Sequence, residues 1–282
     1  MMIKRITIHH FGSVDFFETT FAPEVNILST RDAPEISAAI GILLCDRSGR
    51  FSQRWIHSKT RIMAQILLKD RLYTVGAAPS KKMPGTFSLK AIDISGNDVT
   101  REYRHSLLHC PEQDATEHFD GADRTLPLRL CRYYDDEPGE LSARTEYLSC
   151  TATFRRHLKQ YIQSFTPEPI NNKHQYMASV NEKGAFQVAD PTSTGRITLS
   201  ETERRLFRYI CFLNIAEFWE SIQEIRDLHH EKKPLMIQNF LEFLDESADI
   251  SALITRTKQL HRQILILTTS LPEQAKWLDT EK

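Results

Sequence analysis

Three short apolar segments, each adjacent to a pattern of helical periodicity, place the strongest constraint on the fold of this chain. Val25–Leu28 precedes a helical pattern over Pro34–Leu44. Pro234–Ile237 and Ile264–Leu267 lie on either side of a second helical pattern, Ser251–Leu260. Short apolar runs that alternate with helices are typical of the buried strands of a parallel sheet. The sequence therefore predicts an α/β fold.

The N-terminal part of the chain has the patterns of antiparallel strands. Ile6 and Ile8 alternate with polar residues, which places both on one face of a strand. Turn-forming dipeptides separate the segments with strand character. The predicted elements are a strand over Ile3–Phe11, a turn at Gly12-Ser13, a strand over Phe16–Phe21, a hairpin over Thr60–Val75 that turns at Lys69-Asp70, and a strand pair over Phe87–Thr100 around the turn Ser95–Asp98.

The remainder of the chain adds two helices and a short strand. Phe154–Phe165 is amphipathic, and Phe186–Val188 has the character of a strand. A long helix is predicted from Thr198 to about Leu228. It begins with Ser200 and Glu203, which have the spacing of a capping box.

Composition limits the classes of function. The formal net charge of −1 argues against a dedicated electrostatic nucleic-acid binder, whose domain is usually basic. The 5 cysteines are scattered, so we expect reduced thiols and neither a disulfide framework nor a metal site. The first residues lack the apolar run of a signal peptide, and no segment approaches the ~20 apolar residues needed to cross a bilayer. We therefore expect a cytoplasmic protein without a membrane segment.

The order of these elements resembles the heads of the RecF, SMC and DNA-repair branch of the ABC ATPases (the AAA-domain P-loop superfamily). Residues 3–30, IKRITIHHFGSVDFFETTFAPEVNILST, resemble the start of such heads, where two strands lead into the strand before the P-loop. The resemblance covers about residues 1–75 and 196–270. It implies a P-loop NTPase (ABC-head) fold, which is α/β, with a mixed central sheet, helices on both faces and an antiparallel β lobe. The long heptads of SMC arms are absent from the sequence.

The resemblance also implies a domain organisation. The whole chain, 1–282, is expected to be a single head-like domain. Its N-terminal lobe, 1–110, carries the P-loop position and the antiparallel β subdomain. A connecting insert, 111–195, leads to a C-terminal lobe, 196–282, with the signature, Walker B, D-loop and switch positions.

The P-loop position departs from the family pattern. The family pattern is a glycine, four residues, and then Gly-Lys-Ser/Thr. In this sequence the first glycine position is Thr30, and the last three positions are Glu35-Ile36-Ser37. Only Ser37 matches the pattern. Asp32 and Glu35 at the helix start interact favourably with the helix dipole and would repel a triphosphate. The alternative is that this segment was never a P-loop.

The other nucleotide positions are altered as well. Ser200 matches the signature motif, but its two glycines are replaced, and the capping box alone also explains this serine. At the Walker B position, Gln238 and Asn239 replace the magnesium aspartate and the catalytic glutamate. Asp245 matches the D-loop, and Thr269 stands at the place of the switch histidine.

A basic stretch follows the first helix. Its cations are Arg47, Arg50, Arg54, His57, Lys59 and Arg61. Such a stretch either contacts phosphates of a nucleic acid or forms a solvated basic loop. The sequence leaves both interpretations open.

These features predict a pseudo-ATPase head that binds a protein partner or itself, with no cofactor. Phosphoryl transfer depends on positioning and charge stabilisation, and the groups that supply them are missing. The alternative is a divergent, weak ATP-binding protein or ATPase of the RecF/SMC type that uses Mg-ATP in a DNA-related role. Ser37, Ser200 and Asp245 would then be its retained residues.

Overall fold

The computed structural model of the chain describes residues 1–44, 52–108, 132–134, 169–171, 174–175, 177–180, 186–189, 205, 209, 213, 234–238, 241, 244 and 250–271. The chain forms two compact units. The first unit comprises Met1–Cys110, Glu231–Gln238 and His261–Ser270. The second unit comprises Pro111–His230, Asn239–Leu260 and Leu271–Lys282.

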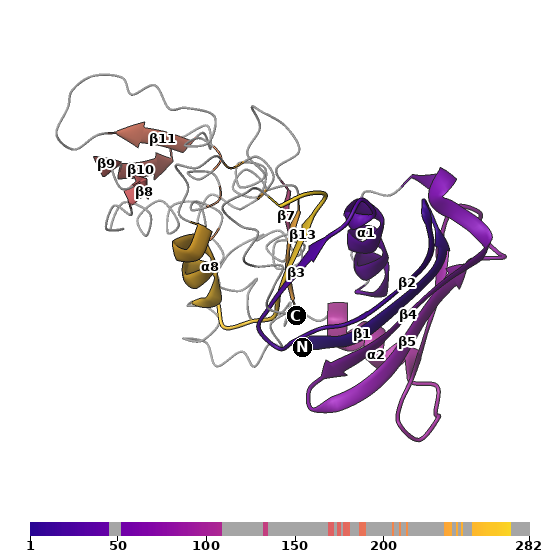
Figure 1. Ribbon diagram of the computed structural model, residues 1–282. Helices are drawn as coiled ribbons and strands as arrows, with labels where there is room; N and C mark the ends of the chain where they lie inside the picture. Colours follow the sequence, from indigo (N-terminus) through magenta and orange to yellow (C-terminus); the bar gives the residue numbers. More distant parts are fainter. Residues whose placement is uncertain are drawn as a thin grey trace. The chain divides into compact units, whose positions relative to one another are not determined.

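A five-stranded antiparallel sheet forms much of the first unit, with the strand order β2-β1-β4-β5-β6 (Figure 1). The strands are β1 Met2–Phe11, β2 Val14–Thr20, β4 Ile56–Leu68, β5 Arg71–Pro79 and β6 Phe87–Ile92. Lys69 and Asp70 both adopt positive φ, 50° and 59°, as a two-residue hairpin turn requires. The antiparallel strands predicted over Ile3–Phe11, Phe16–Phe21 and Thr60–Val75 and their turns at Gly12-Ser13 and Lys69-Asp70 are confirmed.

Three parallel strands form the second layer of this unit, in the order β3-β13-β12 (Figure 1). They are β3 Val25–Ser29, β13 Ile264–Thr268 and β12 Leu235–Gln238. β12 and β13 are buried along their whole length, as predicted. β3 is only half-buried, contrary to the prediction, because it is the end strand of this sheet.

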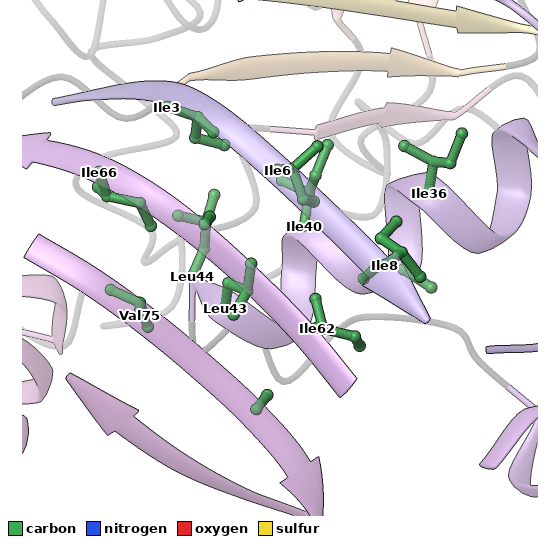
Figure 2. Packing of buried hydrophobic residues seen from close by; sticks show 14 of the residues in the cluster. Ile3, Ile6, Ile8, Ile36, Ile40, Leu43, Leu44, Ile62, Ile66 and Val75 are labelled. Atoms are coloured by element: carbon green, nitrogen blue, oxygen red, sulfur yellow. The ribbon is translucent and has the colours of Figure 1, made fainter. Parts of the chain in front are cut away.

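Helix α1, Ala33–Leu43, lies between the two sheets. It contacts β1, β4 and β5 on one side and β12 and β13 on the other. In Figure 2, Ile40 and Leu43 of α1 lie among the apolar side chains of the antiparallel strands. The sequence predicted one apolar side, but nearly the whole circumference of the helix is buried, as expected for a helix between two sheets.

The strand pair predicted over Phe87–Thr100 is wrong in its second half. After β6, only a single bridge joins Ile92 to Asp98, and helix α2, Thr100–Leu108, begins directly afterwards. The Asp98 carboxylate accepts hydrogen bonds from the backbone N–H of Thr100, at 3.0 Å, and from its hydroxyl, at 2.6 Å. These bonds favour a helix start over a continued strand. The Tyr103 hydroxyl donates to the Leu43 carbonyl over 2.9 Å and thereby holds α2 to the end of α1.

The second unit contains short strands and helix α8. The strands are β7 Arg132–Tyr134, β8 Pro169–Asn171, β9 His174–Gln175, β10 Met177–Val180 and β11 Phe186–Ala189. β11 and α8, Ile250–Lys258, confirm the predicted strand and helix at these places. The predicted helix over Phe154–Phe165 lies outside the described residues.

Three described positions of the predicted long helix, Arg205, Tyr209 and Leu213, are helical, and the rest of it lies outside the described residues. The Tyr209 and Thr257 hydroxyls share a buried hydrogen bond of 2.7 Å. This bond attaches the described part of the helix to α8. No helix within the described residues has the length and apolar character to span a bilayer.

Candidate functional site

The connection between β3 and α1 is the candidate site, because the sequence predicted the P-loop position there. Only Thr30, Arg31 and Asp32 separate the end of β3 at Ser29 from the start of α1 at Ala33. The positions aligned with the family's Gly-Lys-Ser, residues 35–37, therefore already lie inside the helix. The segment is a tight turn and not a loop that wraps around a ligand.

The backbone of this turn is bonded internally. The amide of Ala33 donates to the Thr30 carbonyl over 3.1 Å, and the amide of Asp32 donates to the Thr30 hydroxyl over 3.3 Å. The amide of Ile36 donates to the Asp32 carbonyl over 3.0 Å, as a helical bond. Pro34 has no N–H to offer. Phosphate binding at a helix start uses such backbone amides, and here they have partners within the turn.

Two carboxylates lie at the start of the helix. The Ser13 hydroxyl is 2.8 Å from Asp32 Oδ1 and 3.1 Å from Glu35 Oε1. A hydroxyl has one proton, so it donates to only one of these oxygens at a time. Glu35 is only 9% exposed. The two acids thus occupy the position where a P-loop presents its amides and lysine to phosphate.

The turn between β1 and β2 packs directly on Glu35. Gly12 adopts a φ of 61°, and a Cβ at this position would lie 2.5 Å from the Glu35 Cγ. The Gly12 amide donates to the Trp55 carbonyl over 2.9 Å, which fixes the other side of the turn. The Trp55 ring packs edge-on against Phe11, with ring centroids 5.8 Å apart. Gly12 and Ser13 therefore cover the start of α1.

The lysine position of the motif belongs to the hydrophobic core. Ile36 is fully buried, and Figure 2 shows it near Ile8 of β1. Ser37, the one residue that matches the motif, is 1% exposed. Neither side chain is accessible to a ligand at the helix start. Thr30, the first position of the motif, is half-buried and forms the turn described above.

The structure places two further predicted nucleotide residues at the ends of parallel strands. Gln238 is the last residue of β12 and is buried, and Thr269 follows β13 directly and is exposed. Neighbouring parallel strands end at the same edge of a sheet, where ligands of α/β folds bind. Both residues are neutral. Ser200, Asn239 and Asp245 lie outside the described residues.

The predicted nucleic-acid residues that the structure describes are all exposed. Arg54 lies in the short 3₁₀-helix η1, Gln53–Trp55, and Lys59 and Arg61 lie on β4. The Arg61 guanidinium donates from Nη1 to the Thr60 carbonyl over 2.6 Å, so part of its hydrogen-bonding capacity is used. Arg47 and Arg50 lie outside the described residues.

Sequence reasoning missed Gly12 and Ser13 as parts of the site. They are separated from Asp32 and Glu35 by about two elements of structure, and only the packing of the β1–β2 turn on α1 brings them together. A Gly-Ser dipeptide predicts a turn but not the position of that turn in space. Across the described part of the chain, no three His, Cys, Asp or Glu side chains gather as a metal-binding group.

Comparison with known proteins identifies the fold. No protein-family model and no curated protein matches the sequence. The structure resembles an SMC head bound to the C-winged helix domain of ScpA, with 12% identity, a TM-score of 0.51, and coverage of 95% of this chain and 89% of that chain. It also resembles the recombination mediator protein RecF of the RecFOR pathway in its RecF-ATPrS form, with 11% identity, a TM-score of 0.51, and coverage of 96% and 93%.

The chain has the fold of an ABC-type ATPase head. This confirms the resemblance and the fold class inferred from the sequence. At this level of identity the likeness concerns the fold. The antiparallel sheet corresponds to the predicted antiparallel β lobe, and the parallel strands with α1 belong to the predicted α/β sheet.

Proposed function

We propose that this chain is a non-catalytic ABC-type head that acts as a binding scaffold for a protein partner. The observation that carries the proposal is the start of α1. There, a three-residue turn, Thr30, Arg31 and Asp32, replaces an open phosphate loop, and the carboxylates of Asp32 and Glu35 share the Ser13 hydroxyl.

Electrostatics argue against a triphosphate at this position. Two like unit charges ~4 Å apart repel by about 1 kcal/mol in water and about 4 kcal/mol at the effective dielectric constant of a protein surface. Asp32 and Glu35 would each repel a nearby phosphate charge by an energy of this size. The lysine that compensates for phosphate charge in this motif is replaced by the buried Ile36. A bound nucleotide would therefore lack its cationic anchor and face two anions.

Hydrolysis of ATP needs a general base, a magnesium ligand and a cation beside the phosphate. Among the motif positions that the structure describes, no residue supplies such a group. The Gln238 amide cannot act as a general base and is a poorer magnesium ligand than a carboxylate. The Thr269 hydroxyl cannot carry positive charge toward a phosphate. Asn239 at the catalytic position is likewise neutral in the sequence. These substitutions support a role in binding and not in turnover.

The similar structures support a protein partner. The SMC head in one of them is bound to the winged-helix domain of ScpA, so heads of this fold offer surfaces for other proteins. Scattered cysteines fit a reducing, cytoplasmic compartment. The second candidate function is weak nucleotide binding with a DNA-related role, because the similar RecF structure is an ATPrS form. Ser37, Ser200 and Asp245 would then serve the nucleotide.

Calorimetry with Mg-ATP tests the proposal, with phosphate release measured in parallel. We expect no saturable heat of binding at nucleotide concentrations up to about 1 mM, and no phosphate release above buffer. A dissociation constant of about 1 mM corresponds to a binding free energy of only ~4 kcal/mol. RecF, whose similar structure is an ATPrS form, is the positive control for nucleotide binding. Binding near micromolar together with turnover would overturn the scaffold function and favour the second candidate. Light scattering of the same sample, over a range of concentrations, separates a partner-binding monomer from a head that pairs with itself.

A further inference from the structure

Four exposed cations and an exposed methionine lie at one end of the antiparallel sheet. Arg54 lies in η1 and Lys59 at the start of β4. Lys81 and Lys82 lie in the loop between β5 and β6, followed by Met83, which is 63% exposed. All four cations are exposed. We call these five residues the cationic end.

The fold brings the two parts of the cationic end together. η1 leads into β4, and the loop over residues 80–86 leaves β5, the neighbour of β4 in the sheet. Gly85 in this loop has a φ of 80°, and a Cβ at this position would lie 2.9 Å from the Gln53 Nε2. The backbone of the loop thus lies against η1, one residue before Arg54.

Hydrogen bonds fix the shape of the loop. The Ser80 amide donates to the Thr86 carbonyl over 2.8 Å and closes its base. The Ser80 hydroxyl accepts from the amides of Lys82 and Met83, at 3.3 and 3.2 Å, and the Thr86 hydroxyl donates to the Met83 carbonyl over 2.7 Å. The loop therefore presents the lysines and the methionine on a defined backbone, which lowers the entropic cost of binding.

The charges of the cationic end are available for a partner. None of its four cations forms an ion pair with another residue that the structure describes. Two of the acids that the structure describes lie in or near the β1–β2 turn and have polar neighbours. Asp15 is 3.7 Å from the His10 ring nitrogen, and Asp32 accepts from Ser13. The chain as a whole has a formal net charge of −1, so the surplus of positive charge is local.

We infer that the cationic end binds an acidic segment of a protein partner, with an apolar side chain of that segment placed on Met83. Opposite charge would steer the segment to Arg54, Lys59, Lys81 and Lys82. Methionine and arginine are enriched in protein interfaces, and a flexible thioether adapts to different apolar partners. A nucleic-acid backbone offers phosphates for the cations but no apolar group for Met83. This inference rests on the proposed scaffold function and names the surface and chemistry of its partner.

The test is fluorescence anisotropy of the full chain with a labelled peptide of glutamates around two central leucines, over a salt series. We expect saturable binding that weakens as salt rises, because exposed charges are screened. The double variant Lys81→Glu/Lys82→Glu should bind about tenfold more weakly, and Met83→Ser should weaken binding about threefold. The matched control Lys90→Glu/Arg101→Glu changes the charge equally at exposed positions elsewhere in the first unit. It should bind like the wild type.

A peptide in which serines replace the leucines should bind the wild type and Met83→Ser equally. Absence of binding, or equal loss in the control variant, would overturn the inference. A single-stranded oligonucleotide of the same charge that binds more tightly than the peptide would overturn it in favour of a nucleic-acid surface. Mg-ATP titrated into the same samples keeps the two proposals distinct. Turnover would refute the scaffold function whatever the peptide does, and a failed peptide without turnover would refute only this surface.

Discussion

The side chain of Gln263 and the backbone of Ile3 exchange two hydrogen bonds. The Ile3 amide donates to Gln263 Oε1 over 2.8 Å, and Gln263 Nε2 donates to the Ile3 carbonyl over 2.9 Å. The same Nε2 also donates to the Ala22 carbonyl over 2.8 Å. Gln263 directly precedes β13, so one buried amide joins the parallel strands to the first strand of the antiparallel sheet.

Replacement of Gln263 by alanine should therefore destabilise the protein strongly. It removes three hydrogen bonds and leaves buried backbone groups without a partner, because the side chain is only 3% exposed. The N–H and the carbonyl of Ile3 are the two buried groups, and each costs about 1–3 kcal/mol when it is unsatisfied, so we expect a loss of about 2–6 kcal/mol in the free energy of unfolding. Urea denaturation followed by circular dichroism measures it. Gln259→Ala, at an exposed position, should change stability by less than ~0.5 kcal/mol. Equal losses in the two variants would contradict the prediction.

Gly12→Ala tests the packing of the β1–β2 turn on Glu35. Positive φ and a Cβ 2.5 Å from the Glu35 Cγ both oppose the alanine, and we expect a loss of about 2–3 kcal/mol. Gly96→Ala is the matched control, because Gly96 also has positive φ but no other group lies within 4 Å of the place that a Cβ would take there. It should cost only about 1 kcal/mol.

The steric part of the Gly12 effect should depend on Glu35. In a double-mutant cycle, Gly12→Ala should cost about 1 kcal/mol less when Glu35 is already alanine, because the clashing Cγ is gone. Chemical denaturation of the four proteins gives the coupling. Strict additivity would show that the turn does not pack on Glu35 as described.

Placing the P-loop lysine at Ile36 should damage the fold without creating a phosphate site. The side chain at this position is fully buried in the hydrophobic core that α1 forms with the two sheets of the first unit. A buried, unpaired ammonium group costs at least about 3 kcal/mol, whereas Ile36→Val should cost only about 0.5–1.5 kcal/mol. Thermal unfolding separates the two variants, and calorimetry with Mg-ATP checks for gain of binding. A stable Ile36→Lys protein that binds ATP would show that this helix starts as a P-loop does.

Periodicity predicted the elements whose side chains have one clear apolar face. Ile6 and Ile8 alternate on β1, and both are fully buried. The apolar runs of the sequence predicted β12 and β13, because a strand that is buried on both faces has apolar residues at successive positions. The order of these elements, together with the order and spacing of four degenerate motifs, was sufficient to predict the head fold.

The features that the sequence did not reveal depend on contacts between distant segments. Helix α2 buries Tyr103 and Leu107, and its start depends on the side-chain bonds of Asp98 to Thr100. The closed turn before α1 is visible only when the hydrogen bonds of Thr30 are known. The motif alignment placed Ile36 at a ligand position, whereas the helix starts too early for that residue to leave the core.

The turn after β6 should make stability depend on pH through Asp93. The Asn97 side chain, first, and then the backbone amides of Asn97 and Ser95 bond its carboxylate and hold the pKa of Asp93 below its ordinary value of 3.8. Because the folded pKa is depressed, the carboxylate stabilises the fold above the unfolded pKa. This contribution is lost as the pH falls through 3.8 and then through the lower folded pKa.

Nuclear magnetic resonance titration of the Asp93 carboxyl carbon measures this pKa directly. Asn97→Ala removes the side-chain amide that bonds Asp93 Oδ2 over 3.0 Å, so the pKa of Asp93 should rise toward 3.8. The variant keeps the backbone amides, and the pKa should therefore stay below that value. The stability difference between the wild type and Asn97→Ala should be larger at about pH 6 than at about pH 3, since the protonated carboxyl has no charge for these donors to stabilise. An Asp93 pKa of 3.8 or above in the wild type would mean that the carboxylate does not accept these bonds in solution.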